Sequence, residues 1–222
     1  MKPSALIFDV NETLLDLSHA KPAIAKLFND EEVMVQLWFS TLLHHSLVES
    51  AIGEKHNFTQ IGAAAAKIVA HTQGLSLSLD HAKSVISDAM TTLPAYEDAE
   101  KALRSLSQAR VKLVALSNSP TEGLCEQLEY AGLAKYFDEI LSVEKIGLFK
   151  PHPPVYQWTC QKIGVAVEEC MMVAAHGWDV AGAASAGLQT AFVAREGKCQ
   201  YPLAAESTLR VNSLEELVEA IG

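Results

Sequence analysis

The stretch ALIFDVNETLLDL, residues 5–17, decides the fold class. Its first four residues are all apolar, a pattern typical of a short strand that is buried on both faces of a parallel sheet. This predicted strand runs directly into the carboxylate of Asp9 and then into a polar turn. Because ligands of open α/β sheets bind beyond the carboxyl ends of the strands, Asp9 is a candidate nucleophile. An Asp in this place can also simply cap the turn.

Further apolar segments of strand length alternate with helical patterns downstream of this strand. Residues 20–90, by contrast, contain no convincing strand, and their apolar residues recur at helical spacing. The alternation predicts an α/β fold with a doubly wound parallel sheet, in which a helical cap is inserted after the first strand. We expect residues 1–15 and 91–222 to form the core domain and residues 16–90 the cap. The other predicted strands are residues 111–117, 139–143, 170–175 and 190–193.

The composition restricts the class of protein and of partner. A chain of 222 residues with 49% hydrophobic and 20% charged residues is long and apolar enough to fold around a core. The formal net charge of −10 argues against nucleic acid or an anionic membrane as a partner. No apolar run approaches the ~20 residues that span a bilayer. Reduced thiols in a cytoplasmic protein are the expectation for the scattered cysteines, Cys125, Cys160, Cys170 and Cys199.

Three more polar residues lie at or just after predicted strands. Ser117 ends the second strand, Lys150 lies in the loop after the third, and Asp179 closely follows the fourth. Taken singly, Ser117 and Asp179 could be helix N-caps and Lys150 a surface residue. Taken together, they are expected to converge with Asp9 in one crevice, because the carboxyl ends of parallel strands meet at one edge of a sheet.

These residues lie in four segments that resemble the motifs of the haloacid dehalogenase superfamily. Within it, the pattern resembles the type II L-2-haloacid dehalogenases, whose nucleophile loop lacks a second Asp and whose fourth motif contains a Trp-Asp pair. The resemblance implies a Rossmann-like core with a helical cap, a hydrolase of a small-molecule acid, and a possible homodimer. The segments are FDVNETLLDL (residues 8–17), LSNSP (116–120), FKPHPPVY (149–156) and WDVAGAASAG (178–187).

Two replacements separate this sequence from the magnesium phosphatases that it also resembles. Asn11 stands where those enzymes carry a second Asp, and an amide can neither protonate a leaving alkoxide nor activate water. Ala174 stands where they often have an acidic metal ligand, which leaves Asp9 and Asp179 as too few carboxylates for Mg²⁺. A halide is a very weak base and needs no proton, so both replacements favour displacement at carbon. We therefore expect no cofactor.

Two other classes of function stay open at this point. A phosphatase, or another small-acid hydrolase with the same Asp nucleophile, would require Mg²⁺. A relative of the fold that only binds a small ligand would have no need of Asp9, Lys150 and Asp179 together.

The resemblance implies covalent catalysis, in which Asp9 displaces the halide of a 2-halo acid and water hydrolyses the resulting ester to a 2-hydroxy acid. Lys150 would hold Asp9 ionised, Asp179 would position or deprotonate the water, and Thr13 would hydrogen-bond to the nucleophile or to the substrate. The residues expected to bind the substrate are Val10 and Asn11 through their backbone N–H groups, Ser117, Asn118, Phe39, Phe58, Tyr156, His176 and Trp178.

Three positions depart from the pattern of similar dehalogenases and leave the natural substrate and the halide preference open. Phe39 stands where those enzymes carry an Arg that accepts the halide, and Ala174 and His176 stand where they have a Ser and an Asn near the hydrolytic water. His176 could polarise water or ligand, because its charge is poised near neutral pH, or it could satisfy a buried hydrogen bond. The other candidates for the missing cation are the cap histidines His44, His45 and His56.

Overall fold

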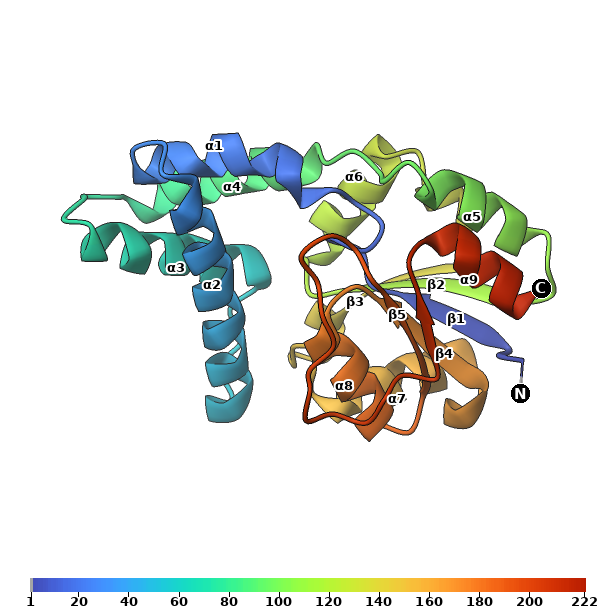
Figure 1. Cartoon of the computed structure of the whole chain (residues 1–222). Helices are drawn as coiled ribbons and strands as arrows, with labels where there is room; N and C mark the ends of the chain where they lie inside the picture. The colour runs from blue at the N-terminus through green and yellow to red at the C-terminus, as the bar shows by residue number, and fades with distance from the viewer. Residues whose placement is uncertain (1) are drawn as a thin grey trace.

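The computed structural model describes residues 2–222, so Met1 of the predicted core lies outside the described residues. The strands form one parallel sheet in the order β3-β2-β1-β4-β5-β6, which confirms the predicted doubly wound α/β fold (Figure 1). The strands are β1 (Ala5–Phe8), β2 (Lys112–Ser117), β3 (Glu139–Ser142), β4 (Cys170–Ala174), β5 (Gln189–Val193) and β6 (Leu209–Val211).

The central strand is β1, which pairs with β2 on one side and with β4 on the other. All four of its residues are buried, as the unbroken apolar run predicts. The direction of winding reverses between β1 and β4, so the crevice of this sheet opens at their carboxyl ends. Asp9 follows β1 at this point, and His176 and Asp179 follow β4.

Helices cover both faces of the sheet. The helices α5 (Ala99–Ser107), α6 (Thr121–Tyr130) and α9 (Leu214–Ile221) lie on one face, and α7 (Pro153–Ile163) and α8 (Gly177–Ser185) lie on the other (Figure 1). Both termini lie at the end of the sheet away from the crevice. Short 3₁₀ helices at Ala134–Tyr136, Val143–Lys145 and Val167–Glu169 complete the connections.

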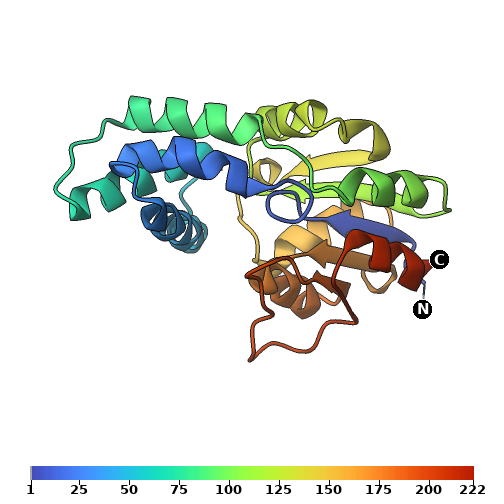
Figure 2. The same cartoon turned by 45° about the horizontal axis from the view of Figure 1, so that its top comes forward.

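The segment between β1 and α5 is helical, with no strand among its described residues. Figure 2 shows these helices gathered at one end of the core, beyond the carboxyl edge of the sheet. Trp38 ties two of them together, because its indole N–H donates to the carbonyl of Gly62 at 2.9 Å. The helices are α1 (Lys21–Ala25), α2 (Glu32–Ile52), α3 (Phe58–Thr72) and α4 (Leu79–Thr91), with 3₁₀ turns at Leu17–Ala20 and Lys26–Phe28.

Two local features differ from the sequence prediction. The helix after β4 begins at Gly177, with His176 as its N-cap residue, so Asp179 lies inside the first helical turn. A carboxylate is stabilised there by the helix dipole. The strand β6 was not predicted, because a segment of only Leu209–Val211 with an exposed Arg210 carries no recognisable periodicity.

Candidate active site

Asp9 lies just beyond β1, and both of its carboxylate oxygens are engaged. Lys150 Nζ is 2.7 Å from Oδ1, and the Thr13 hydroxyl donates to Oδ2 at 2.8 Å. His176 Nδ1 lies 2.9 Å from the same Oδ2. Burial raises the pKa of Asp9, but the charges of Lys150 and His176 outweigh it and hold this pKa far below its usual range. Asp9 is therefore a fully ionised, oriented carboxylate.

The loop after Asp9 is fixed by its own backbone and by the core. The amides of Leu14 and Leu15 both donate to the carbonyl of Val10, which closes a tight turn. The hydroxyl of Thr13 accepts from the amide of Ala175 at 2.9 Å, so its proton is directed at Asp9. The loop thus holds the nucleophile against the carboxyl end of β4.

Lys150 joins the two carboxylates that were predicted to meet. Its side chain is 1% exposed, and Nζ donates to Asp9, to Asp179 Oδ2 at 2.6 Å and to the carbonyl of Leu116 at 3.2 Å. Burial alone lowers the pKa of Lys150, but Asp179 and Asp9 outweigh it, and the pKa is raised. Lys150 is therefore a buried cation with all three N–H donors satisfied. Its backbone amide donates to Asn118 Oδ1 at 2.9 Å, which positions the loop that carries it.

Asp179 is fully buried and saturated with hydrogen bonds. Tyr156 donates to Oδ1 at 2.5 Å, and Lys150 holds Oδ2. Burial raises the pKa of Asp179, and Lys150 offsets part of this rise. Asp179 thus lies behind Lys150 as its second counter-ion.

His176 lies between two carboxylates, an arrangement that the sequence alone did not reveal. Nδ1 faces Asp9, and Nε2 lies 2.9 Å from Glu12 Oε2. Ionised carboxylates only accept hydrogen bonds, so both nitrogens carry a proton and the ring is an imidazolium. Burial lowers the pKa of His176, but the hydrogen bonds to Asp9 and Glu12 outweigh it and raise this pKa to about 9.

Glu12 and Lys198 are site residues that the sequence reasoning missed. Glu12 has a φ of 60°, in the left-handed region, and its carboxylate contacts His176. Lys198 Nζ lies 2.7 Å from Oε2 of Glu12, the same oxygen that faces His176. The only signal in the sequence was the position of Glu12 within the nucleophile loop, and nothing marked Lys198.

The imidazolium of His176 is stacked between two aromatic rings. Its ring centroid lies 4.9 Å from that of Trp178 and 6.1 Å from that of Phe39, each with an interplanar angle of 27°. Phe39 belongs to α2 of the cap, so this stack joins cap and core directly over the nucleophile. The position that carries an Arg in similar dehalogenases therefore reaches the site in this chain too, and a positive charge lies beside it on His176.

The remaining predicted residues surround this centre in different ways. Phe58 lies against Phe149, with ring centroids 5.8 Å apart. Ser117 accepts from the amide of Ser119 at 3.1 Å and so holds a turn; the structure shows no hydrogen bond from Ser117 to Asp9. Among the described residues, the backbone N–H groups of Val10 and Asn11 have no protein acceptor, and both residues are buried.

Two hollows lie between cap and core, and no residue of the nucleophile loop lines either of them. One, of about 180 Å³, is lined by Phe58, Asn118 and Phe149, together with Lys55 and Lys145. The other, of about 50 Å³, is lined by Phe39, Phe58, Ser119 and Gln127, among others.

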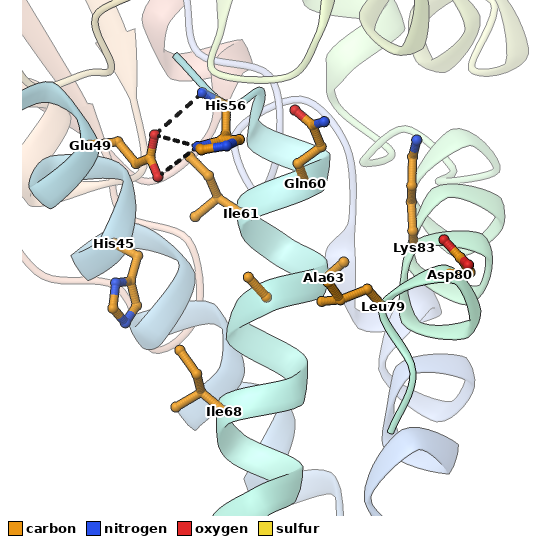
Figure 3. Close-up of a pocket in the computed structure, with 11 residues that line it drawn as sticks. His45, Glu49, His56, Gln60, Ile61, Ala63, Ile68, Leu79, Asp80 and Lys83 are labelled. Carbon is orange, nitrogen blue, oxygen red and sulfur yellow. Dashed lines mark hydrogen bonds and ion pairs between the residues drawn. The ribbon is translucent and has the colours of Figure 1, made fainter. Parts of the chain in front are cut away.

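No hydrogen bond joins a cap histidine to Asp9, although His56 also lines the hollow of about 180 Å³. His45 and His56 line a separate groove of about 440 Å³ along α3, where His56 Nδ1 is 3.0 Å from both carboxylate oxygens of Glu49 (Figure 3). His44 lies edge-on against His45, with ring centroids 5.2 Å apart. His176 is therefore the histidine that places a positive charge beside Asp9, in addition to Lys150.

Within residues 2–222, no group of three or more His, Cys, Asp or Glu side chains is arranged to hold a metal ion. The carboxylates of Asp9 and Asp179 are bridged by the ammonium of Lys150, and Asn11 and Ala174 add no further carboxylate beside them. The donor set is therefore a poor fit to Mg²⁺, which prefers several oxygen ligands in an octahedron.

The chain is similar to known proteins along nearly its whole length. The family model for haloacid dehalogenase-like hydrolases matches residues 3–187. The chain is 31% identical over 221 residues to (S)-2-haloacid dehalogenase 1 of Pseudomonas sp. (strain CBS-3), covering 98% of this chain and 96% of that protein. It is 30% identical over 214 residues to (S)-2-haloacid dehalogenase 4A of Burkholderia cepacia, covering 96% and 92%.

A solved structure agrees with these sequence matches. The L-2-haloacid dehalogenase of Xanthobacter autotrophicus with chloropropionic acid covalently bound superposes with a TM-score of 0.92 at 25% identity, covering 99% of this chain and 98% of that one. Since the family model covers most of the sequence and the core carries an ionised Asp at the end of its central strand, the chain belongs to the haloacid dehalogenase-like hydrolases.

Proposed function

We propose that this protein is a hydrolase of the (S)-2-haloacid dehalogenase type, which displaces halide from a small 2-halo acid and releases a 2-hydroxy acid. One observation carries the proposal: Asp9 is a buried, ionised carboxylate held by Lys150, Thr13 and His176. Beside it, Asn11 replaces the general acid that an alkoxide leaving group would require. Such a site suits a leaving group that departs as an anion without a proton.

In the first half-reaction, a carboxylate oxygen of Asp9 attacks Cα of the substrate from the side opposite the halogen. The C–O bond forms as the carbon–halogen bond breaks, and the halide leaves with the bonding electron pair. The free N–H groups of Val10 and Asn11 bind the substrate carboxylate, and Phe39 and Phe58 supply the apolar wall around the halogen. The product of this step is an ester of Asp9.

In the second half-reaction, water attacks the carbonyl carbon of that ester. The ester bond breaks on the side of Asp9, so the 2-hydroxy acid leaves with an oxygen that came from Asp9. Lys150 keeps the regenerated carboxylate ionised, and Asp179 with Tyr156 keeps Lys150 in place. The substrate carbon has undergone a single displacement, so its configuration is inverted.

We propose that the reaction requires no metal ion. Halide release from (S)-2-chloropropionate should be unchanged by EDTA, because the ammonium of Lys150 already bridges Asp9 and Asp179. Hydrolysis of p-nitrophenyl phosphate, with and without added Mg²⁺, should stay at background in the same panel. Phosphate hydrolysis that EDTA abolishes, without halide release from any 2-halo acid, would instead identify the magnesium phosphatase.

We further propose a cytoplasmic homodimer. The four cysteines are free thiols, as in reducing compartments. Val33, Leu37 and Leu47 are exposed along α2, with fractions of 63%, 45% and 45%, and offer an apolar face to a second copy. Light scattering after size exclusion should give twice the chain mass, and Leu37→Lys should shift it to that of the monomer; a monomeric wild type contradicts the dimer.

No helix in residues 2–222 is long and apolar enough to cross a membrane.

A further inference from the structure

His176 is the one imidazole in direct contact with the reacting carboxylate. Nδ1 lies 2.9 Å from Asp9 Oδ2, an oxygen bonded to the carbon that water attacks in the second half-reaction. Its side chain is 7% exposed, and Phe39 and Trp178 cover its two faces. Nε2 is anchored by Glu12, which fixes the ring with Nδ1 directed at Asp9. A carboxylate, an imidazole and a reacting group in line are the geometry of a general base with its orienting acid.

We propose that His176 is the general base of the second half-reaction: its Nδ1 takes a proton from the water that attacks the Asp9 ester. This inference rests on the proposed function, because it requires the ester to form. Glu12 is a positioning residue that holds the ring, and Lys198 holds Glu12.

The loss of the negative charge of Asp9 on esterification converts the imidazolium of His176 into a neutral imidazole that can act as a base. In the resting enzyme, His176 faces Asp9 and Glu12, with Lys150 and Lys198 behind those carboxylates as the other charged groups around it. Esterification removes the negative charge of Asp9 and leaves Glu12 as the only anion in contact with the ring. The pKa of His176 then falls from about 9 toward its ordinary value of about 6.5. Nδ1 releases its proton to solvent and presents a lone pair to water.

The atoms balance over one turnover. The water oxygen bonds to the ester carbon while one water proton moves to Nδ1, and the carbonyl π electrons move onto the carbonyl oxygen. Collapse of this intermediate breaks the bond to the substrate oxygen, which takes the proton from Nδ1. The remaining acidic proton on Asp9 then passes to Nδ1, which restores the imidazolium–carboxylate pair. The single proton released to solvent at esterification is the proton of the overall hydrolysis to hydroxy acid, halide and H⁺.

Asp179 is the alternative base, and its contacts argue against it. Oδ1 accepts from Tyr156, Oδ2 accepts from Lys150, and the residue is 0% exposed. To accept a proton from water, Asp179 would have to break one of these bonds. His176 loses a charged partner at the very moment when a base is needed.

The test separates the two half-reactions by rapid quench with (S)-2-chloropropionate at a series of pH values. Chloride reports esterification, and the intact mass of the protein reports the ester on Asp9. In the wild type, ester hydrolysis should accelerate as pH rises through a midpoint between about 6.5 and 9, and the ester should accumulate below it.

His176→Asn installs the residue type that similar dehalogenases carry, so the ring is lost while a polar side chain is kept. This variant should still release one equivalent of chloride per site. Its ester hydrolysis should be about 10²-fold slower than that of the wild type above the midpoint, and independent of pH. Glu12→Gln keeps the ring but removes the remaining anion, so its midpoint should move to lower pH. His71→Asn, at an exposed histidine near the end of α3, is the matched control and should retain the wild-type profile.

The outcomes are distinct. If His176→Asn hydrolyses the ester with the wild-type rate and pH profile, His176 is not the general base. If the chloride burst disappears in this variant, the proposed role of His176 is also overturned. A midpoint unmoved by Glu12→Gln also overturns it. Absence of both chloride and ester in the wild type, with every 2-halo acid tested, overturns the proposed function itself.

Discussion

Asp9→Asn should reduce kcat/KM for 2-chloropropionate by roughly 10⁴-fold or more, the scale of loss when a covalent nucleophile is removed. The amide has no charge and is a poor nucleophile. The variant should still fold, because Lys150 keeps Asp179 and His176 keeps Glu12 as counter-ions. Steady-state chloride release measures the loss, and thermal unfolding of the same samples provides the folding control.

Isotope labelling tests the same nucleophile by a positive signal. In a single turnover in ¹⁸O-water, the label should enter the Asp9 side chain, since water attacks the ester carbon on Asp9. The first hydroxy acid released should contain no label, because its new oxygen comes from Asp9. Label found only in the product would indicate direct attack of water on the substrate and would exclude an ester intermediate.

The residues that sequence reasoning brought to the centre share one property. Asp9 directly follows β1, and Lys150 and Asp179 lie in the segments that follow β3 and β4, so the parallel topology directs all three segments toward one edge of the sheet. The helical segment between β1 and α5 was equally visible, since its length and its missing strands leave few alternatives. Local hydrophobic patterns predict the order of strands and helices along the chain. That order predicts a parallel sheet, in which the carboxyl ends of the strands meet at one edge.

The second cation at Asp9 could not be predicted in the same way. Glu12 contacts His176 from a backbone conformation with a φ of 60°, and a Glu in this loop does not predict a left-handed conformation. Lys198 lies in an irregular segment after β5, and such a segment has no hydrophobic periodicity from which the orientation of its side chains could be predicted. Phe39 meets His176 only through the docking of the cap on the core, a contact between segments far apart in sequence. The His176 side chain was singled out, but its partners were not.

Lys150→Met should destabilise the protein by about 3–5 kcal/mol at pH 7, the cost of removing one partner from a buried ion pair. Lys150 is 1% exposed and is the shared counter-ion of Asp9 and Asp179, so its loss leaves two carboxylates facing each other in the interior. Chloride release should fall with it, because the pKa of Asp9 rises when its closest cation is gone.

The pH dependence of this loss has a definite sign. In the wild type, the lowered pKa of Asp9 stabilises the folded state above the unfolded value of 3.8, and this contribution disappears as pH falls toward the folded pKa. In Lys150→Met, burial without a cation raises the pKa of Asp179 further in the folded state, so protonation on lowering the pH relieves the repulsion. The stability difference between the two proteins should therefore be largest near pH 7 and should shrink toward pH 5, as measured by urea unfolding.

A double-mutant cycle identifies the cause. Adding Asp9→Asn to Lys150→Met removes one of the two unpaired carboxylates, so the double variant should be more stable than Lys150→Met alone at pH 7. The coupling expected for groups in direct contact is about 0.5–3 kcal/mol. Strictly additive effects, or a loss that is the same at pH 5 and pH 7, would mean that Lys150 stabilises the fold by packing its alkyl chain. In that case the orientation and ionisation of Asp9 would have to come from His176 and Thr13 alone, and Lys150→Met would keep most of its chloride release.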